Sequence, residues 1–275
     1  VECGWGAPIW CVSAEIMRHY NNGAAGWKLE EIDDFNKMLD VLYPWVKKVS
    51  ESEKTRHNYA TSAALALVSI GIFQDNETIF QEGVDFLKLL MPYTFEEDGR
   101  LRETCRDCDH AEYNLIGYLQ ATEMVWHQGI DLYSRKLDGQ DTPRIILGMD
   151  FHAHALLGRP KPNRMCSPLN CGRMDKGAGG WESAYNHYVY RTGIEVTPAI
   201  EEFITEHNRI TTISENHFFN FTTLTHGDLG DVREVKAKRY GYENNAAGKK
   251  QCFQRCLRVN HPVGSRRPGV FIYRR

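Results

Sequence analysis

The sequence predicts an all-α protein built from antiparallel helical hairpins, and three observations support this fold class. Apolar residues recur every three or four positions through most of residues 7–226, which is the spacing of one helix face. Residues that cap helices stand directly before several of these stretches. No convincing alternation of apolar and polar residues, the pattern of a half-buried strand, occurs before the last few positions.

The predicted helices follow one another closely along the chain. Apolar stripes predict helices over residues 29–49, 56–73, 78–90 and 110–127. Capping residues in Asp75-Asn76, Thr142-Pro143 and Thr197-Pro198 mark the start of the helix at 78 and of two more over 144–157 and 199–204. Helices with short connections pack as antiparallel neighbours in a bundle, a solenoid or a closed α/α toroid. The sequence has no repeat of fixed period, which disfavours a regular solenoid.

Charge divides the chain into a helical domain over residues 1–226 and a basic extension over 227–275. The domain holds 21 Lys and Arg against 32 Asp and Glu, a net charge of −11, and the extension holds 12 against 4, a net charge of +8. A basic extension suits a polyanion, but packing on the body is the commoner arrangement, so we expect no nucleic-acid partner. The longest apolar run, 63–72, is too short to cross a bilayer, so no membrane partner is expected either.

The cysteines and two sequons bear on the compartment. Eight cysteines lie in four close pairs, Cys3/Cys11, Cys105/Cys108, Cys166/Cys171 and Cys252/Cys256. This even count suits an oxidised protein with up to four disulfides. Glycosylation sequons at Asn76 and Asn220 point to the same secretory route. We therefore expect a secreted, extracellular glycoprotein, and we expect it to be a monomer.

A zinc site is the alternative interpretation of Cys105, Cys108 and His110. Structural zinc takes four ligands, and the sequence offers no second Cys-x-x-Cys pair to complete the set. A disulfide that braces this turn is the simpler prediction. We expect neither a metal ion nor another cofactor.

Three polar clusters open predicted helices. The first is Arg56-His57-Asn58-Tyr59, the second includes Arg102, Arg106, His110 and Tyr113, and the third includes Trp181, Tyr185 and His187. On a helix that begins near Asp109, His110 and Tyr113 share one face. Such groups suit β-elimination on a uronic acid. Arginine, histidine and amide donors neutralise the sugar carboxylate, and a tyrosine removes the C5 proton and protonates the departing O4.

The order of these clusters resembles the alginate-lyase superfamily of α/α-toroid polysaccharide lyases. The resemblance covers about residues 5–226 and includes Asp98-Gly-Arg-Leu101, Arg106 seven residues before Tyr113, Gly129-Ile-Asp-Leu-Tyr133 and Trp181-Glu182 followed by Tyr185-Asn186-His187-Tyr188. It implies a toroid or an incomplete toroid. It also implies that Tyr113 is base and acid, that His57 neutralises the substrate carboxylate and that Arg106 pairs with it or activates the phenol.

One position departs from the family pattern. Family members place an asparagine directly before the histidine, whereas here Arg56 precedes His57 and Asn58 follows it. Either His57 or Asn58 therefore takes the carboxylate-neutralising position. The expected substrate-binding residues are Arg56, Arg102, His110, Trp181, Tyr185 and His187.

The implied function is cleavage of a β-1,4-linked acidic polysaccharide, either mannuronate-rich alginate or glucuronan. One alternative is a glycoside hydrolase, which needs two carboxylic acids about 5–10 Å apart. Its candidates are Glu103, Asp107, Glu112 and Glu182. The other alternative is a helical carbohydrate-binding protein without catalysis. A lyase product carries a double bond that absorbs ultraviolet light, and the product of a hydrolase does not.

Overall fold

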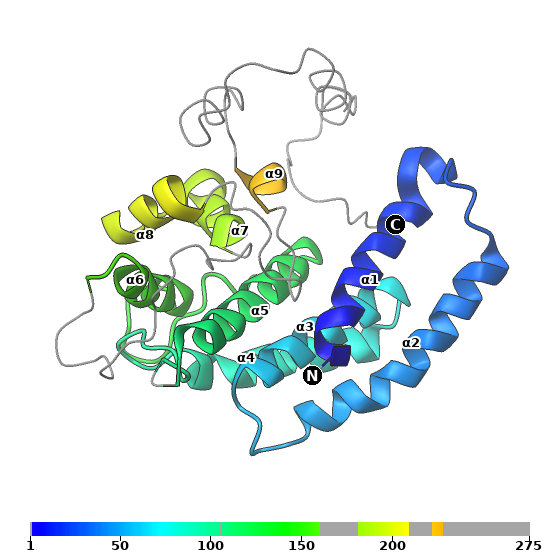
Figure 1. Ribbon diagram of the computed structural model, residues 1–275, viewed down its shortest axis with the longest axis horizontal. Helices are drawn as coiled ribbons and strands as arrows, with labels where there is room; N and C mark the ends of the chain where they lie inside the picture. The colour runs from blue at the N-terminus through cyan, green and yellow to red at the C-terminus, as the bar shows by residue number, and fades with distance from the viewer. Residues whose placement is uncertain (1, 105, 160–180, 209–221, 228–275) are drawn as a thin grey trace, which may run out of the picture. The chain divides into compact units, whose positions relative to one another are not determined.

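The computed structural model describes residues 2–104, 106–159, 181–208 and 222–227, and most of them are helical (Figure 1). The long helices are α1 (Glu2–His19), α2 (Leu29–Ser50), α3 (Asn58–Phe73), α4 (Glu77–Thr94), α5 (Cys108–His127) and α6 (Arg144–Leu156). Shorter elements are the 3-10 turn η1 (Tyr20–Gly23), α7 (Trp181–Asn186), α8 (Pro198–Glu202), α9 (Thr222–His226) and two π-helical turns, η3 (His187–Thr192) and η4 (Phe203–Asn208). No strand forms within these ranges, so the all-α class is confirmed, and closure into a toroid stays a prediction.

The helix starts follow the capping residues that the sequence offers. The Asn76 side chain accepts a hydrogen bond from the backbone N–H of Ile79 at 3.2 Å. The hydroxyl of Thr197 accepts one from Ile200 at 3.4 Å. Helix α5 begins at Cys108 rather than at Asp109, because the Asp107 carboxylate caps it. The predicted helix starts therefore agree with the observed ones to within a few residues.

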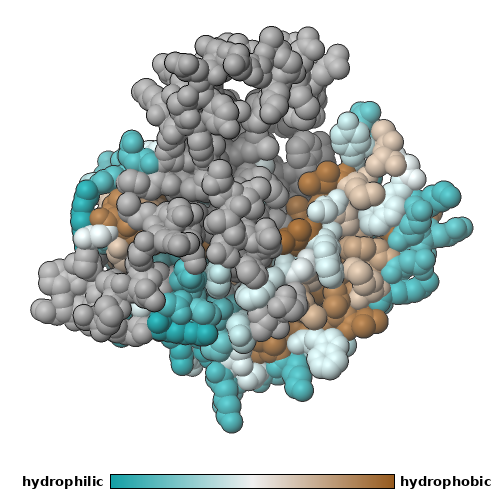
Figure 2. Space-filling view, in the orientation of Figure 1, coloured by the Kyte–Doolittle hydropathy of each residue, from teal (hydrophilic) through white to brown (hydrophobic). Residues whose placement is uncertain are grey.

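Helix α3 is the centre of the hydrophobic core. It packs against α1, α2, α4 and α5, and nearly all of its residues are buried. A helix that is apolar all round requires neighbours on every side. Helices α1 and α2 instead keep apolar residues at the surface, and Figure 2 shows this on the side of the molecule that they form. These exposed residues include Trp10, Ile16, Met17, Val41 and Trp45.

Two glycines let α3 and α4 approach closely. A Cβ atom on Gly71 of α3 would lie 2.4 Å from the backbone nitrogen of Phe80 on α4. A Cβ atom on Gly83 of α4 would lie 2.8 Å from the backbone nitrogen of Val68 on α3. Neither distance leaves room for a methyl group, so the spacing of this helical hairpin depends on both glycines.

A tight turn joins α4 to the segment before α5. Phe95 pairs with Leu101 in an isolated β-bridge, and Gly99 between them has φ of +85°. The Gly99 backbone lies so close to the Leu147 carbonyl that a Cβ atom would be 2.1 Å from its oxygen. The buried Arg144 side chain donates from Nε to the Phe95 carbonyl at 3.1 Å. These contacts fix the turn, so that the residues after it lie next to the start of α3.

Cys3 and Cys11 are both free thiols, so this close pair is not one of the disulfides that the cysteine count suggested. Both lie on α1, and eight residues of helix separate them by about 12 Å, whereas a disulfide needs Cα atoms within about 7 Å. Burial raises the pKa of the Cys11 thiol to about 12. Each of the other three close pairs of cysteines includes a residue outside the described ranges.

Several other predictions also concern residues outside the described ranges. These are the sequon at Asn220 and the basic extension from residue 228 onward. None of the helices within the described ranges has the length and apolarity needed to cross a bilayer.

Candidate functional site

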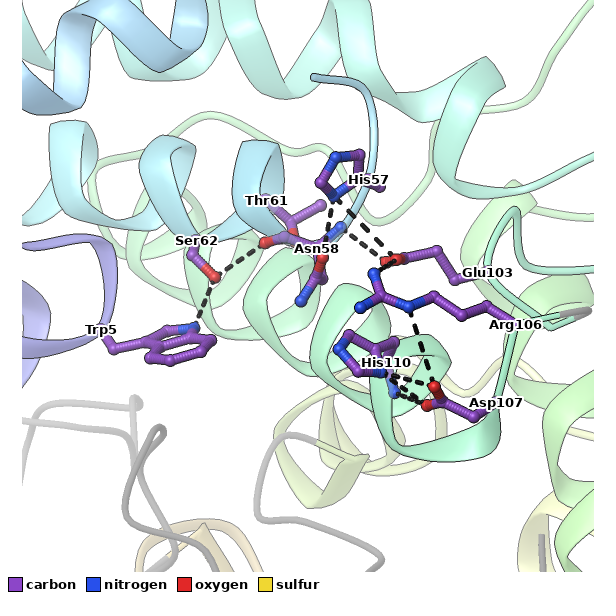
Figure 3. Close-up of polar contacts among 9 residues, drawn as sticks. All are labelled: Trp5, His57, Asn58, Thr61, Ser62, Glu103, Arg106, Asp107 and His110. Atoms are coloured by element: carbon purple, nitrogen blue, oxygen red, sulfur yellow. Dashed lines mark hydrogen bonds and ion pairs between the residues drawn. The ribbon is translucent and has the colours of Figure 1, made fainter. Parts of the chain in front are cut away.

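The starts of α3 and α5 meet around the carboxylate of Glu103 (Figure 3). Oε2 of Glu103 accepts a hydrogen bond from the backbone N–H of Asn58 at 2.8 Å. Oε1 accepts one from Nη1 of Arg106 at 3.2 Å. Glu103 is buried, whereas half of the Arg106 side chain is exposed, so only the hydrogen bond to Asn58 is fully shielded from water. Glu103 thus holds together two of the residues predicted to be catalytic.

His57 and Asn58 lie side by side at the first turn of α3. Nδ1 of His57 is 2.9 Å from Oδ1 of Asn58 and 4.0 Å from Oε1 of Glu103. Because the amide oxygen only accepts, Nδ1 of His57 is the donor of this hydrogen bond. Nδ2 of Asn58 is buried and has no hydrogen-bond partner within the described part of the chain. An unsatisfied buried donor is costly, by about 1–3 kcal/mol, and often marks a functional position.

Arg106 and His110 both contact the Asp107 carboxylate. Nδ1 of His110 lies 2.7 Å from Oδ1, and Nε of Arg106 lies 3.8 Å from Oδ2. Burial alone would raise the pKa of Asp107, but hydrogen bonds from the His110 backbone and ring, with the Arg106 charge, outweigh it and hold the pKa below its ordinary value. The ionised carboxylate fixes the proton of His110 on Nδ1, so Nε2 is an acceptor.

Tyr113 is half-buried one turn after His110 on α5. Its ring meets the His110 ring edge-on, with centroids 5.8 Å apart. On another side its ring meets that of Trp5, with centroids 6.1 Å apart and an angle of 64° between the planes. The phenol is therefore held between a residue of α1 and the imidazole of its own helix.

Trp5 links Tyr113 back to the start of α3. Nε1 of Trp5 donates to the Ser62 hydroxyl at 2.9 Å, and this hydroxyl donates to the Asn58 carbonyl at 2.8 Å. A Cβ atom on Gly4 would lie 3.1 Å from that of Ser62, so α1 approaches α3 closely at this point. The contacts form a closed circuit through Asn58, Glu103, Arg106, Asp107, His110, Tyr113, Trp5 and Ser62. All four residues predicted to be catalytic belong to this circuit or adjoin it.

Arg56 and Arg102, which are predicted to bind substrate, converge on Tyr93 instead of on the circuit itself. The Cζ atoms of Arg56 and Arg102 lie 5.9 Å and 5.7 Å from the centroid of the Tyr93 ring. Each arginine nevertheless directly precedes a residue of the site, since Arg56 comes before His57 and Arg102 before Glu103.

The third polar cluster lies in the hydrophobic core. Trp181 is fully buried, donates to Oε2 of Glu112 at 3.3 Å and packs against Phe203. Tyr185 is buried, and the buried His187 stacks on Tyr133 with centroids 4.1 Å apart. Burial lowers the pKa of His187 to about 4, so its ring is neutral near pH 7. This placement argues against direct substrate contact by Trp181, Tyr185 and His187.

Glu123, His127 and His226 could hold a metal ion, since one ligand atom from each lies within 4.8 Å of the others. Sequence reasoning missed this group, although Glu123 and His127 are four residues apart on one helix face. Arg191 already binds the Glu123 carboxylate with both terminal nitrogens, at 2.9 and 3.1 Å. Because the Arg191 guanidinium already neutralises the Glu123 carboxylate, we interpret these residues as a buried ion pair rather than as a metal site.

The protein is all-helical, and the circuit places an arginine, an imidazole and a phenol at its helix starts. This combination defines a class of protein suited to proton transfer on an anionic substrate. A family model described as "Alginate lyase" matches residues 9–162, more than half of the 275-residue chain. The chain belongs to the alginate lyase family, and this assignment supports a polysaccharide lyase. Searches of curated proteins and of solved structures gave no match.

Proposed function

We propose that this protein cleaves a β-1,4-linked polyuronide by β-elimination, leaving unsaturated uronide ends. The observation that carries the proposal is the circuit around Glu103, which gathers Asn58, Arg106 and His110 beside the phenol of Tyr113. The family match covers every member of the circuit except Trp5. The sequons and the acidic-polysaccharide chemistry support action outside the cell as part of the same proposal.

The donors neutralise the carboxylate of the sugar that is cleaved. The proton on C5 is only weakly acidic while this carboxylate is ionised. The unpartnered amide of Asn58, the His57 ring and the Arg106 guanidinium supply positive charge and hydrogen bonds to it. Donors held in place before the reaction stabilise the enolate-like charge at little reorganisation cost.

Tyr113 transfers the proton in both directions. Its phenolate takes the C5 proton, and the electron pair of that C–H bond forms the C4–C5 double bond as the C4–O4 bond breaks. The phenol then returns the proton to O4, so the tyrosine ends in its starting state. His110, whose Nδ1–H is held by Asp107, lies against the phenol ring and can relay this proton through Nε2.

The test is the substitution Tyr113→Phe. It should abolish ultraviolet-absorbing products on polymannuronate and glucuronan while folding and polyuronide binding persist. Tyr118→Phe on the same helix is the matched control, because the Tyr118 hydroxyl donates to the Leu87 carbonyl in the core, and it should remain active. Wild-type turnover in Tyr113→Phe would refute the assigned role.

The hydrolase alternative is disfavoured by the state of its carboxylates. Both carboxylate oxygens of Glu103 already accept hydrogen bonds, one from Asn58 and one from Arg106. Asp107 has a lowered pKa, so Asp107 is a poor proton donor. Glu112 lies 2.7 Å from Nε2 of His152 in the core, and Glu182 is fully buried. New reducing ends without ultraviolet absorbance would favour the hydrolase, and binding without cleavage would favour a carbohydrate-binding protein.

The polyuronide itself is either mannuronate-rich alginate or β-1,4-glucuronan, which differ at C2 of the sugar. In both polymers, H5 and O4 have positions on the sugar ring that allow the same elimination. A panel of purified polyuronides with absorbance and product size as readouts separates the two.

A further inference from the structure

Two arginines and two aromatic rings form a cationic surface next to the circuit, which we call the Tyr93 patch (Arg56, Phe86, Tyr93 and Arg102). Phe86 and Tyr93 lie seven residues apart on one face of α4. Arg56 Cζ lies 5.5 Å from the Phe86 centroid, and both guanidiniums lie within 6 Å of the Tyr93 centroid. A cation–π contact orients a guanidinium without using its N–H groups, which remain available for a ligand.

The arginines of the Tyr93 patch have no carboxylate partner within the described ranges. Within these ranges Arg56 makes one side-chain hydrogen bond, a long one of 3.5 Å to the Ser50 carbonyl. By contrast, several other arginines pair with a carboxylate, in the pairs Arg18–Glu15, Arg100–Glu96, Arg159–Glu202 and Arg191–Glu123. Two unpaired guanidiniums together, in a domain of net charge −11, are the arrangement expected where an anion binds.

The patch is accessible and adjoins the site. Tyr93 is 41% exposed and Arg102 is exposed. Arg102 directly precedes Glu103 of the circuit, and Arg56 directly precedes His57, which adjoins it, so the Cα atoms of each pair are about 3.8 Å apart. A polymer that occupies the site therefore passes the patch with an adjacent sugar.

We infer that the Tyr93 patch binds the carboxylate of the uronic acid residue next to the one that is cleaved. This inference rests on the proposed function, since it assigns a second sugar of the same polyuronide. Two guanidiniums offer a carboxylate paired, charge-assisted hydrogen bonds, which a neutral sugar does not form. The patch selects a polymer that carries carboxylates on consecutive residues.

The binding experiment uses Tyr113→Phe as the parent, so that oligouronates bind without being cleaved. Titration calorimetry with the oligomers should show about tenfold weaker binding for each of Arg56→Gln and Arg102→Gln, the usual loss for a hydrogen bond between charged groups. Tyr93→Leu keeps Phe86 covered and removes the cation–π contacts, so it should weaken binding by a smaller factor. Arg100→Gln, whose side chain is paired with Glu96 in the same turn, is the matched control and should bind like the parent.

The same substitutions in the active protein should raise KM about tenfold and leave kcat within about twofold, because the patch does not touch the reacting atoms. Unchanged oligouronate affinity in the double Arg56→Gln/Arg102→Gln variant would overturn the inference alone. An equal loss with carboxyl-reduced, neutral oligomers would also overturn it. A Tyr113→Phe parent that binds no oligouronate would instead overturn the proposed function, and the inference with it.

Discussion

Glu103 decides the geometry of the site at the scale of single residues. Its buried carboxylate accepts from the Asn58 backbone and from the Arg106 guanidinium, which lie on segments about 50 residues apart. One acceptor with a full negative charge therefore sets the distance between the amide and the guanidinium. Glu103 acts as a positioning residue through these two partners.

Glu103→Gln should disturb the positions of Asn58 and Arg106 while the protein still folds. The amide can still accept from Asn58, but its NH₂ group faces the donors of Arg106, so we expect kcat to fall by about 10–100-fold with a smaller change in KM. Stability should fall by about 1–3 kcal/mol, because a buried charged hydrogen bond is lost. Steady-state kinetics and urea unfolding measure the two effects.

Glu96→Gln is the matched control, since Glu96 also pairs with an arginine, Arg100, but at the surface. It should change neither kcat nor stability measurably. If Glu103→Gln lost stability and kept its kcat, Glu103 would have a structural role only.

Residue types at helix starts predicted several of the residues that the structure brings together in the candidate site. His57, Asn58, Arg106 and Tyr113 were expected because polar groups at the first turns of helices are chemically suited to the reaction. Trp5 could not be predicted, since no local pattern tells which indole of an N-terminal helix meets a helix about 55 residues later. Glu103 was considered only as an acid, because the sequence does not reveal which partners a carboxylate will have.

At the scale of helices, the close packing of α3 against α4 depends on glycine rather than on apolar bulk. Periodicity predicted both helices because their apolar residues face a core. It could not predict their separation, since Gly71 and Gly83 contribute no apolar side chain to a stripe. The same limit applies to Trp181, Tyr185 and His187, since a pattern of aromatic and polar groups at a helix start does not show that these side chains face the core.

Gly71→Ala should destabilise the protein although alanine is the better helix former. The added Cβ would meet the Phe80 backbone at 2.4 Å, and overpacking of this kind costs about 1–3 kcal/mol, more than the ~1 kcal/mol gained in helix propensity. Thermal unfolding should show a lower Tm. Gly6→Ala on α1 is the control, because its Cβ would lie 3.4 Å from the Trp10 ring, and its Tm should not fall. A Gly71→Ala variant as stable as wild type would show that the hairpin can widen without cost.

At the scale of the whole domain, Glu123 joins elements far apart in the chain. Its buried carboxylate on α5 accepts from Tyr133 at 2.9 Å and from Arg191 of η3, and it faces His226 of α9 at 3.1 Å. Burial alone would raise the pKa of Glu123, but His127, His226 and Arg191 together hold it well below its ordinary value. The energy of this group therefore depends on pH.

The sign of that dependence follows from the lowered pKa. The folded state favours the ionised form, so the stabilisation is complete above the ordinary carboxyl pKa near 4.5 and is lost as the pH falls below it. Glu123→Gln should cost about 3–5 kcal/mol at pH 7, as is usual when one partner of a buried ion pair is removed. The difference in unfolding free energy from wild type should shrink as the pH is lowered from 5 to 3.

Glu82→Gln is the control for this prediction. Glu82 also accepts from a tyrosine and a cation, Tyr43 and Lys47, but it lies near the surface, so its loss should cost less than about 1 kcal/mol. A gap between wild type and Glu123→Gln that stays constant from pH 7 to pH 3 would contradict the assignment of the effect to ionised Glu123.

Helices α3 and α5 both begin at the site, and a helix start carries about half a positive elementary charge. Residues 1–226 together have a net charge of −11, which repels a polyanion at long range, while the two helix starts attract one at short range. Fields in physiological salt fade over about 8 Å. Dissolved ions therefore screen the long-range repulsion more strongly than the short-range attraction at the site. Recognition of a polyuronide begins at contact rather than at a distance.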